Sequence, residues 1–135
     1  MSIGIGGRGF LVEEDEDTAI YNYGGYNLDI PQFANPQRVC DGLIIIDKNS
    51  LVEPEIHTKI KRLPGGRKKK IIKRIVVDVP YQELVEKGKI QIENCSNSWH
   101  LLYAEKDMIA YKLLYIIFTE YQKDGFLPKS VTYNI

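Results

Sequence analysis

The stretch MIAYKLLYIIF, residues 108–118, is apolar on nearly every side of a helix. A helix on the surface keeps one polar face, so a helix with this pattern has to be packed among other elements. The stretch lies within residues 104–123, which we predict to form the longest helix, ended by Gly125 and Pro128. The apolar stretch 108–118 is too short to span a membrane, which takes about 20 apolar residues. We therefore expect this helix to lie at the centre of the fold.

Most of the chain before this helix has the composition of β-strands. We predict a hairpin over residues 8–26, with the acidic run 13–17 as its turn. Residues 27–40 hold two prolines and two asparagines and are predicted to form a long loop. Further strands are predicted at residues 41–47, 69–79, 89–93 and 130–134.

Two shorter helices are predicted between these strands. Ser50 and Glu53 fit a capping box, and apolar residues follow at helical spacing, so we predict a helix over residues 50–63. Pro80 predicts the start of a second helix over residues 81–87. The length of 135 residues suits one domain. The expected fold is a single α+β domain over residues 1–135, a mostly antiparallel sheet packed on a long buried C-terminal helix.

Charge is distributed very unevenly along a chain whose net charge is zero. Residues 1–55 carry 10 acidic and 3 basic side chains, whereas residues 56–74 carry 9 basic and no acidic ones. In the segment LPGGRKKKIIKR, residues 63–74, six basic residues follow a Gly-Gly turn. A protein that coats nucleic acid nonspecifically is usually basic overall, so this chain is better described as a neutral body with one basic patch.

The basic patch has three interpretations. It can bind the phosphates of a nucleic acid, attract an acidic protein partner, or form a solvated edge strand that resists pairing with other chains. No aromatic residue is interleaved with it, so base stacking is not offered there. The residues concerned are Arg67, Lys68, Lys69, Lys70, Lys73 and Arg74.

Two further sets of residues are candidates for partner contacts. The acidic set, Glu13, Glu14, Asp15, Glu16 and Asp17, is suited to a basic partner, although such a run is most often just a solvated turn. The aromatic set is Tyr21, Tyr23, Tyr26 and Trp99, which belong either to the core or to a contact face.

Motifs for catalysis and for cofactor binding are weak. Residues 4–9 spell G-x-G-x-x-G, but a dinucleotide site needs a strand before the motif and a helix after it, so we expect a flexible lead-in instead. Cys40, Cys95, His57 and His100 lack metal-ligand spacing, and no local signature supports a Cys–His nucleophile pair. We expect no cofactor, no metal and no enzymatic activity. The first residues lack the apolar run of a signal peptide, so we expect a cytoplasmic protein without a membrane segment.

The segments GRGF, YNYGGYN, PGGRKKK and ENCSNSW resemble those of small uncharacterised single-domain proteins of Gram-positive anaerobes. Small neutral-to-acidic proteins of this kind resemble immunity proteins, which neutralise a cognate bacterial toxin. The resemblance implies a non-enzymatic protein-binding module with a protein partner, for instance a toxin domain. The alternative is an accessory protein that binds nucleic acid through residues 67–74.

Overall fold

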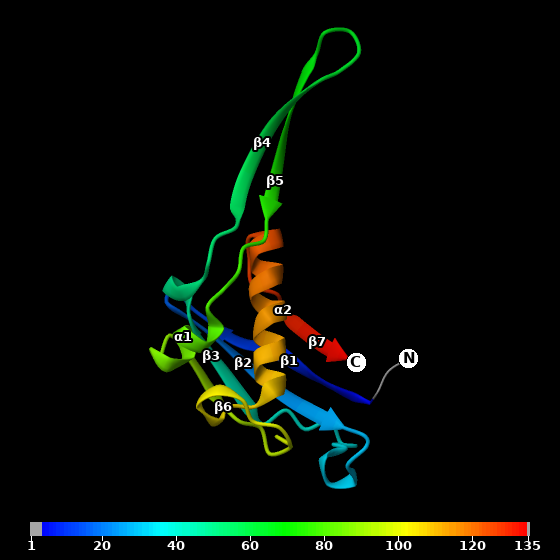
Figure 1. Ribbon diagram of the computed structural model, residues 1–135, viewed down its shortest axis with the longest axis vertical. Coiled ribbons are helices and arrows are strands. Elements are labelled where there is room, and N and C mark those ends of the chain that lie inside the picture. Colours follow the sequence, from blue (N-terminus) through cyan, green and yellow to red (C-terminus); the bar gives the residue numbers. More distant parts are fainter. Residues whose placement is uncertain (1–3, 135) are drawn as a thin grey trace.

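A five-stranded antiparallel sheet and one long helix form the body of the protein (Figure 1). The computed structural model describes residues 4–134. The strands lie in the order β6-β3-β2-β1-β7, and every neighbouring pair is antiparallel. Their bounds are β1 (Ile5–Glu14), β2 (Thr18–Asn27), β3 (Gly42–Asp47), β6 (Ile90–Glu93) and β7 (Ser130–Asn134). The predicted α+β fold, with an antiparallel sheet on a C-terminal helix, is confirmed.

The long helix α2 (Met108–Asp124) packs on one face of this sheet and forms the core with it. Alternate residues of a strand point to the same face, and on that face the strands contribute Tyr21, Tyr23, Ile44 and Ile46, all fully buried. The helix contributes buried side chains from Ile109 to Phe118. The helix is central as predicted, and Lys112 and Tyr115 form its exposed side.

Glycines in β1 and β2 allow the close packing of the helix and of a loop on the two faces of the sheet. A Cβ atom at Gly7 would lie 2.4 Å from the Ile109 side chain, because the helix comes close to the strand there. On the opposite face, a Cβ atom at Gly24 would lie 2.0 Å from the carbonyl oxygen of Val39. The loop that follows β2, which holds the short helix η1 (Pro31–Phe33), therefore crosses directly over this strand.

The segment after β3 departs from the prediction. The predicted helix over residues 50–63 is wrong: apart from one turn, η2 (Lys48–Ser50), this segment leads into strand β4 (Glu55–Arg62). Ile56 and Ile60 are four residues apart, a spacing that places them on one face of a helix and equally on one face of a strand. Pairing with β5 (Lys68–Ile75), which is distant in the sequence, decides between the two conformations.

The remaining predicted elements are present, but the strand predicted over residues 69–79 ends at Ile75 and the helix predicted from residue 104 begins at Met108. The short helix α1 (Tyr81–Glu86) follows Pro80, and one turn, η3 (Tyr103–Glu105), precedes α2. Helix α2 ends at Gly125, whose φ of 83° is the left-handed conformation that glycine adopts readily. Among residues 4–134, no helix is long and apolar enough to cross a membrane.

Candidate functional site

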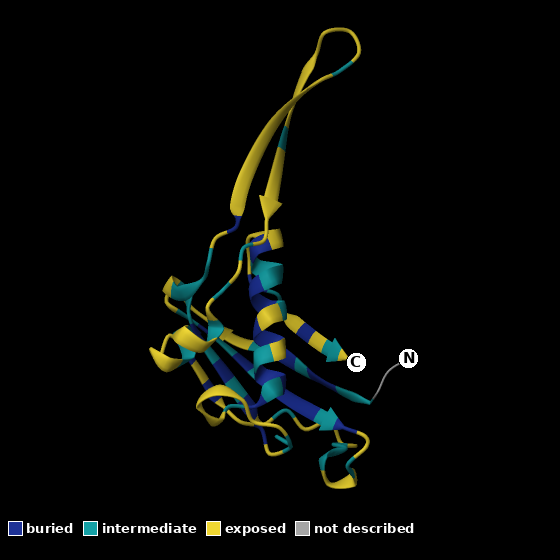
Figure 2. Cartoon of the chain, viewed as in Figure 1, coloured by how far each residue is buried: buried dark blue, intermediate teal, exposed yellow. Residues whose placement is uncertain are grey.

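Strands β4 and β5 form a two-stranded hairpin that projects from the body beyond the C-terminal end of α2 (Figure 1). We call residues 55–75 the arm. Every residue of β4 is exposed, and in β5 only Ile71 is partly covered, which Figure 2 shows as an almost continuous yellow ribbon. An isolated two-stranded hairpin is marginally stable in water, and residues 55–75 contribute no side chain to the core cluster of the body.

The turn at the tip is made by the Pro-Gly-Gly sequence. Gly65 and Gly66 have φ values of 86° and 83°, which side chains with a Cβ rarely adopt. The amide of Leu63 donates to the carbonyl of Arg67 at 2.6 Å and closes the loop. The amide of Gly66 donates to the carbonyl of Leu63, so it is already used inside the turn.

The pairing register sorts the side chains of the arm onto two faces. Cross-strand partners share a face, and successive residues alternate between faces. One face, which we call the lysine face, holds the pairs Lys61–Lys69 and His57–Lys73 together with Lys59. Its one carboxylate, Glu55, lies at the base of the arm and contacts His57 at 2.8 Å. Four lysines thus lie in two neighbouring rows along this face.

The opposite face, which we call the isoleucine face, combines exposed apolar side chains with basic ones. Ile56, Ile60 and Ile72 lie on this face and are 53%, 67% and 59% exposed. Exposed large apolar residues in a cluster commonly indicate a contact surface. The basic residues on the same face are Arg62, Lys68, Lys70 and Arg74.

The predicted basic set is therefore divided by the register. The lysine face holds Lys69 and Lys73. The isoleucine face holds Lys68, Lys70 and Arg74. The tip holds Arg67. Lys59 and Lys61 are missing from the predicted set, because the sequence pattern predicts a helix there. The alternation of basic and β-branched residues from His57 to Arg62 is the signal that could have identified them.

The base of the arm is fixed to the last turn of α2. Gln122, which is 1% exposed, accepts from the amide of Val77 at 2.7 Å and donates to the carbonyl of Val77 at 3.0 Å. Arg74 donates from Nε to the carbonyl of Gln122 at 2.8 Å. A cation is favourable at the C-terminal end of a helix, where carbonyl groups lack partners. Arg74 is therefore committed to holding the arm and is not a free phosphate ligand.

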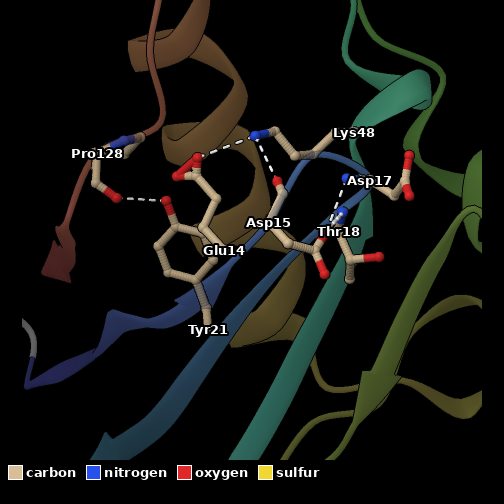
Figure 3. Close-up of polar contacts among 7 residues, drawn as sticks. All are labelled: Glu14, Asp15, Asp17, Thr18, Tyr21, Lys48 and Pro128. Carbon is tan, nitrogen blue, oxygen red and sulfur yellow. Dashed lines mark hydrogen bonds and ion pairs between the residues drawn. The ribbon is translucent and has the colours of Figure 1, made fainter.

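Some carboxylates of the acidic turn between β1 and β2 are engaged in contacts within the protein (Figure 3). Asp15 Oδ1 accepts from the amides of Asp17 and Thr18, both at 2.8 Å, and these bonds hold the pKa of Asp15 below its usual value. Lys48 contacts Glu14 at 3.1 Å and the carbonyl of Asp15 at 2.9 Å. Of the five predicted acidic residues, Glu13, Glu16 and Asp17 keep carboxylates that make no hydrogen bond or ion pair within residues 4–134.

The predicted aromatic contacts belong mainly to the interior. Tyr21 and Tyr23 are fully buried, with Tyr21 donating to the carbonyl of Pro128, so an exposed contact face is wrong for both. Trp99 is partly buried and packs edge-on against His100. Tyr26, also partly buried, bonds Asn134 through its hydroxyl. These four side chains do not form one cluster with either charged set.

A buried polar network surrounds the first turn of α2. Asp107, at its N-cap, is 1% exposed and accepts from the amide of Ile109 at 3.0 Å. Its other oxygen accepts from Tyr23 at 2.9 Å, from Ser98 at 3.0 Å and from the thiol of Cys95 at 3.4 Å. Burial raises the pKa of the Cys95 thiol, so at neutral pH it is the neutral donor rather than a nucleophilic thiolate.

Alkylation tests this assignment of Cys95. In the native protein we expect iodoacetamide to modify Cys40, which is partly exposed, before Cys95, which is buried. Both thiols should react after denaturation. Mass spectrometry of the two cysteine peptides over time provides the measurement. Faster modification of Cys95 than of Cys40 in the native state would contradict a purely structural role for Cys95.

The other predicted motifs also have defined positions in the fold. The G-x-G-x-x-G segment is not a flexible lead-in, because residues 5–9 belong to β1, and no helix follows the motif. His57 lies on an exposed strand instead of a helix face, and His100 lies in the loop before α2. Within residues 4–134, no group of three or more histidine, cysteine, aspartate or glutamate side chains is arranged to hold a metal ion.

No protein-family model, curated protein sequence or solved structure matches this chain. We therefore infer the function from the geometry of the arm.

Proposed function

We propose that this protein binds double-stranded nucleic acid through the lysine face of the arm. The observation that carries the proposal is the projecting two-stranded hairpin with Lys59, Lys61, Lys69 and Lys73 on one face. The major groove of B-form DNA admits a two-stranded β-ribbon. Strands of 8 residues are about 27 Å long at the usual rise per residue. This length suits a ribbon that contacts the phosphates on both sides of a groove.

The proposed binding is electrostatic and largely independent of sequence. Lysines attract phosphates and release condensed counterions, which makes the affinity depend strongly on salt. The arm has no aromatic side chain to stack on bases, and lysine lacks the rigid fork with which arginine reads guanine. A duplex is therefore the preferred ligand, and we expect only a weak preference for base sequence.

The isoleucine face favours a second candidate function, the binding of a protein partner. Ile56, Ile60 and Ile72 offer apolar contact area, and the basic residues beside them would complement an acidic rim on the partner. An immunity protein that occludes a toxin is one protein of this class. In that case the free carboxylates of Glu13, Glu16 and Asp17 offer a separate face to a basic toxin.

The two candidates predict different sensitivities of the arm. The first test variant replaces all four lysines of the lysine face by glutamine: Lys59→Gln, Lys61→Gln, Lys69→Gln and Lys73→Gln. We expect its affinity for a DNA duplex to be at least about 30-fold lower than that of the native protein, since each exposed charge contributes about 0.5–1 kcal/mol. The slope of log affinity against log salt should fall by about 0.9 for each phosphate that the variant no longer neutralises. Fluorescence anisotropy of a labelled duplex between about 50 and 200 mM salt measures both quantities.

The matched control changes four lysines on the body, Lys106, Lys112, Lys123 and Lys129, to glutamine. It alters the net charge equally, and we expect it to bind the duplex with a nearly unchanged salt slope. Equal losses for both variants, or no duplex binding by the native protein at low salt, would contradict the proposal. A protein partner that binds the native protein but not the Ile56→Thr, Ile60→Thr, Ile72→Thr variant would instead favour the second candidate.

A further inference from the structure

A cavity of about 350 Å³ lies on the face of the sheet opposite α2. It is bordered by β1, β2 and the loop after β2, at the end of β2 where Figure 1 shows that loop turning back. Arg8 is the cross-strand partner of Gly24, and the loop crosses this strand pair at Gly24. Figure 1 shows the arm projecting from the other end of the body, so the cavity is a site separate from the lysine face.

Asn35 ties together the loop that borders the cavity and links it to β2 through the carbonyl of Gly25. Asn35 donates from Nδ2 to the carbonyls of Gly25 and Val39, both at 3.0 Å, and its Oδ1 accepts from the amide of Val39 at 2.9 Å. Asn35 and Arg38 have φ values of 50° and 55°, in the left-handed region. Asparagine tolerates that region, but arginine does not favour it. Strain of this kind persists where the surrounding structure fixes it, and it is concentrated at binding sites.

Two arginines, Arg8 and Arg38, belong to the lining of this cavity. Within residues 4–134, no carboxylate forms an ion pair with either group. The neighbouring Asp41 accepts from the amide of Ser96 at 3.0 Å. Cys40 also lines the cavity, and burial raises the pKa of its thiol, so it adds no negative charge at neutral pH.

The rest of the lining is largely apolar, with Leu28, Ala34, Pro36 and Val39 from the loop and the ring of Tyr26. Cavities of roughly 300–1,000 Å³ with a mostly apolar lining and a few polar groups are typical of small-molecule sites. A guanidinium group binds carboxylate and phosphate oxygens through parallel hydrogen bonds. An apolar lining with two unpaired arginines matches a ligand that combines an anionic group with an apolar body.

We propose that this cavity binds a small organic anion, with a phosphate or carboxylate group held by Arg8 and Arg38 and an apolar part against Tyr26, Leu28 and Val39. Phenyl phosphate is a probe of this chemistry, and inorganic phosphate and benzamidine are its controls. Inorganic phosphate lacks the apolar body, and benzamidine has the ring with the opposite charge. Both should bind at least about tenfold more weakly than phenyl phosphate, because each lacks one of the two contributions.

The test uses isothermal titration calorimetry on the full chain that also carries the four Lys→Gln changes of the lysine face, so that the arm does not take up the anion. We expect Arg8→Met and Arg38→Asn each to weaken phenyl phosphate binding by about tenfold or more, because each removes a charged hydrogen-bond donor. Asparagine is chosen at position 38 because it accepts the left-handed backbone. Lys129→Met, on the exposed segment before β7, is the matched control and should leave the affinity unchanged.

Several results would overturn the proposal. The first is that phenyl phosphate does not bind the protein that carries only the four Lys→Gln changes. The second is that inorganic phosphate or benzamidine binds as tightly as phenyl phosphate. The third is that Lys129→Met weakens phenyl phosphate binding as much as the arginine variants do. Thermal unfolding of each variant establishes that it is folded before titration. If Arg8→Met fails to fold, Arg38→Asn decides alone, because Arg38 lies in an exposed loop. The titrated protein lacks the lysines of the lysine face, so a negative result for the cavity does not bear on the proposed duplex binding. A negative result for duplex binding likewise does not bear on the cavity.

Discussion

Replacing Asp107 with alanine is expected to lower the free energy of unfolding by about 4 kcal/mol, through loss of the helix cap and of the partner of several buried donors. The carboxylate caps α2 through the amide of Ile109 and accepts from Tyr23, Ser98 and Cys95. Tyr23 is fully buried, so its hydroxyl cannot turn to water when the acceptor is removed. Urea unfolding followed by circular dichroism measures the loss.

Two further variants separate the contributions at Asp107. Asp107→Asn keeps the shape and one oxygen for the helix cap, so we expect a smaller loss of about 1–2 kcal/mol. Ser98→Ala removes one donor only and should cost about 1 kcal/mol. A loss below about 1 kcal/mol in Asp107→Ala would mean that water replaces the carboxylate, and that the network does not hold β2 to the start of α2.

The elements that could be predicted from the sequence are those whose pattern has one interpretation. The apolar run from Met108 to Phe118 is too long for a typical strand, and Gly125 follows as a helix stop, so the segment predicts a helix. The run from Gly42 to Asp47 is short and β-branched and predicts a buried strand. Both predictions are confirmed, because burial against the rest of the protein stabilises the conformation that the local pattern already favours.

Strand β4 could not be predicted in this way, because its decisive contacts are distant in the sequence. A capping box and an i, i+4 repeat of isoleucines both favour a helix locally. The ladder to β5 supplies backbone hydrogen bonds along eight residue pairs, from Glu55–Ile75 to Arg62–Lys68, and outweighs that preference. The two faces of the arm follow only from this register, so the sequence predicts a basic segment but not a basic surface.

The cavity could not be predicted for a related reason. Arg8 belongs to a glycine-rich segment that suggests a nucleotide motif, and Arg38 to a loop with no motif. They line one cavity because β1 pairs with β2 and the loop after β2 folds back across Gly24. A side chain at position 24 would clash with the carbonyl of Val39, so the glycine is required for a structural reason that a single sequence does not reveal.

Replacing Gln122 with leucine is expected to lower the free energy of unfolding by about 2 kcal/mol, because it leaves the partly buried amide and carbonyl of Val77 without their partners. The variant should also loosen the arm, because β5 leaves the body next to Val77. We expect amide hydrogens of β4 and β5 to exchange faster, and those of β2 and β3 to change less. Hydrogen exchange measured by mass spectrometry, with Gln91→Leu on the exposed face of β6 as control, tests this result.

The same variant shows whether the arm has to be held in one direction. Gln122→Leu keeps all four lysines of the lysine face, and the carbonyl of Gln122 still accepts from Arg74. If the orientation of the arm contributes to duplex binding, the affinity should fall by about three- to tenfold, because a mobile arm loses more conformational entropy when it binds. The salt slope should stay unchanged, because the same lysines neutralise the phosphates. An unchanged affinity together with fast exchange in β4 and β5 would mean that the lysine face binds as a flexible polycation.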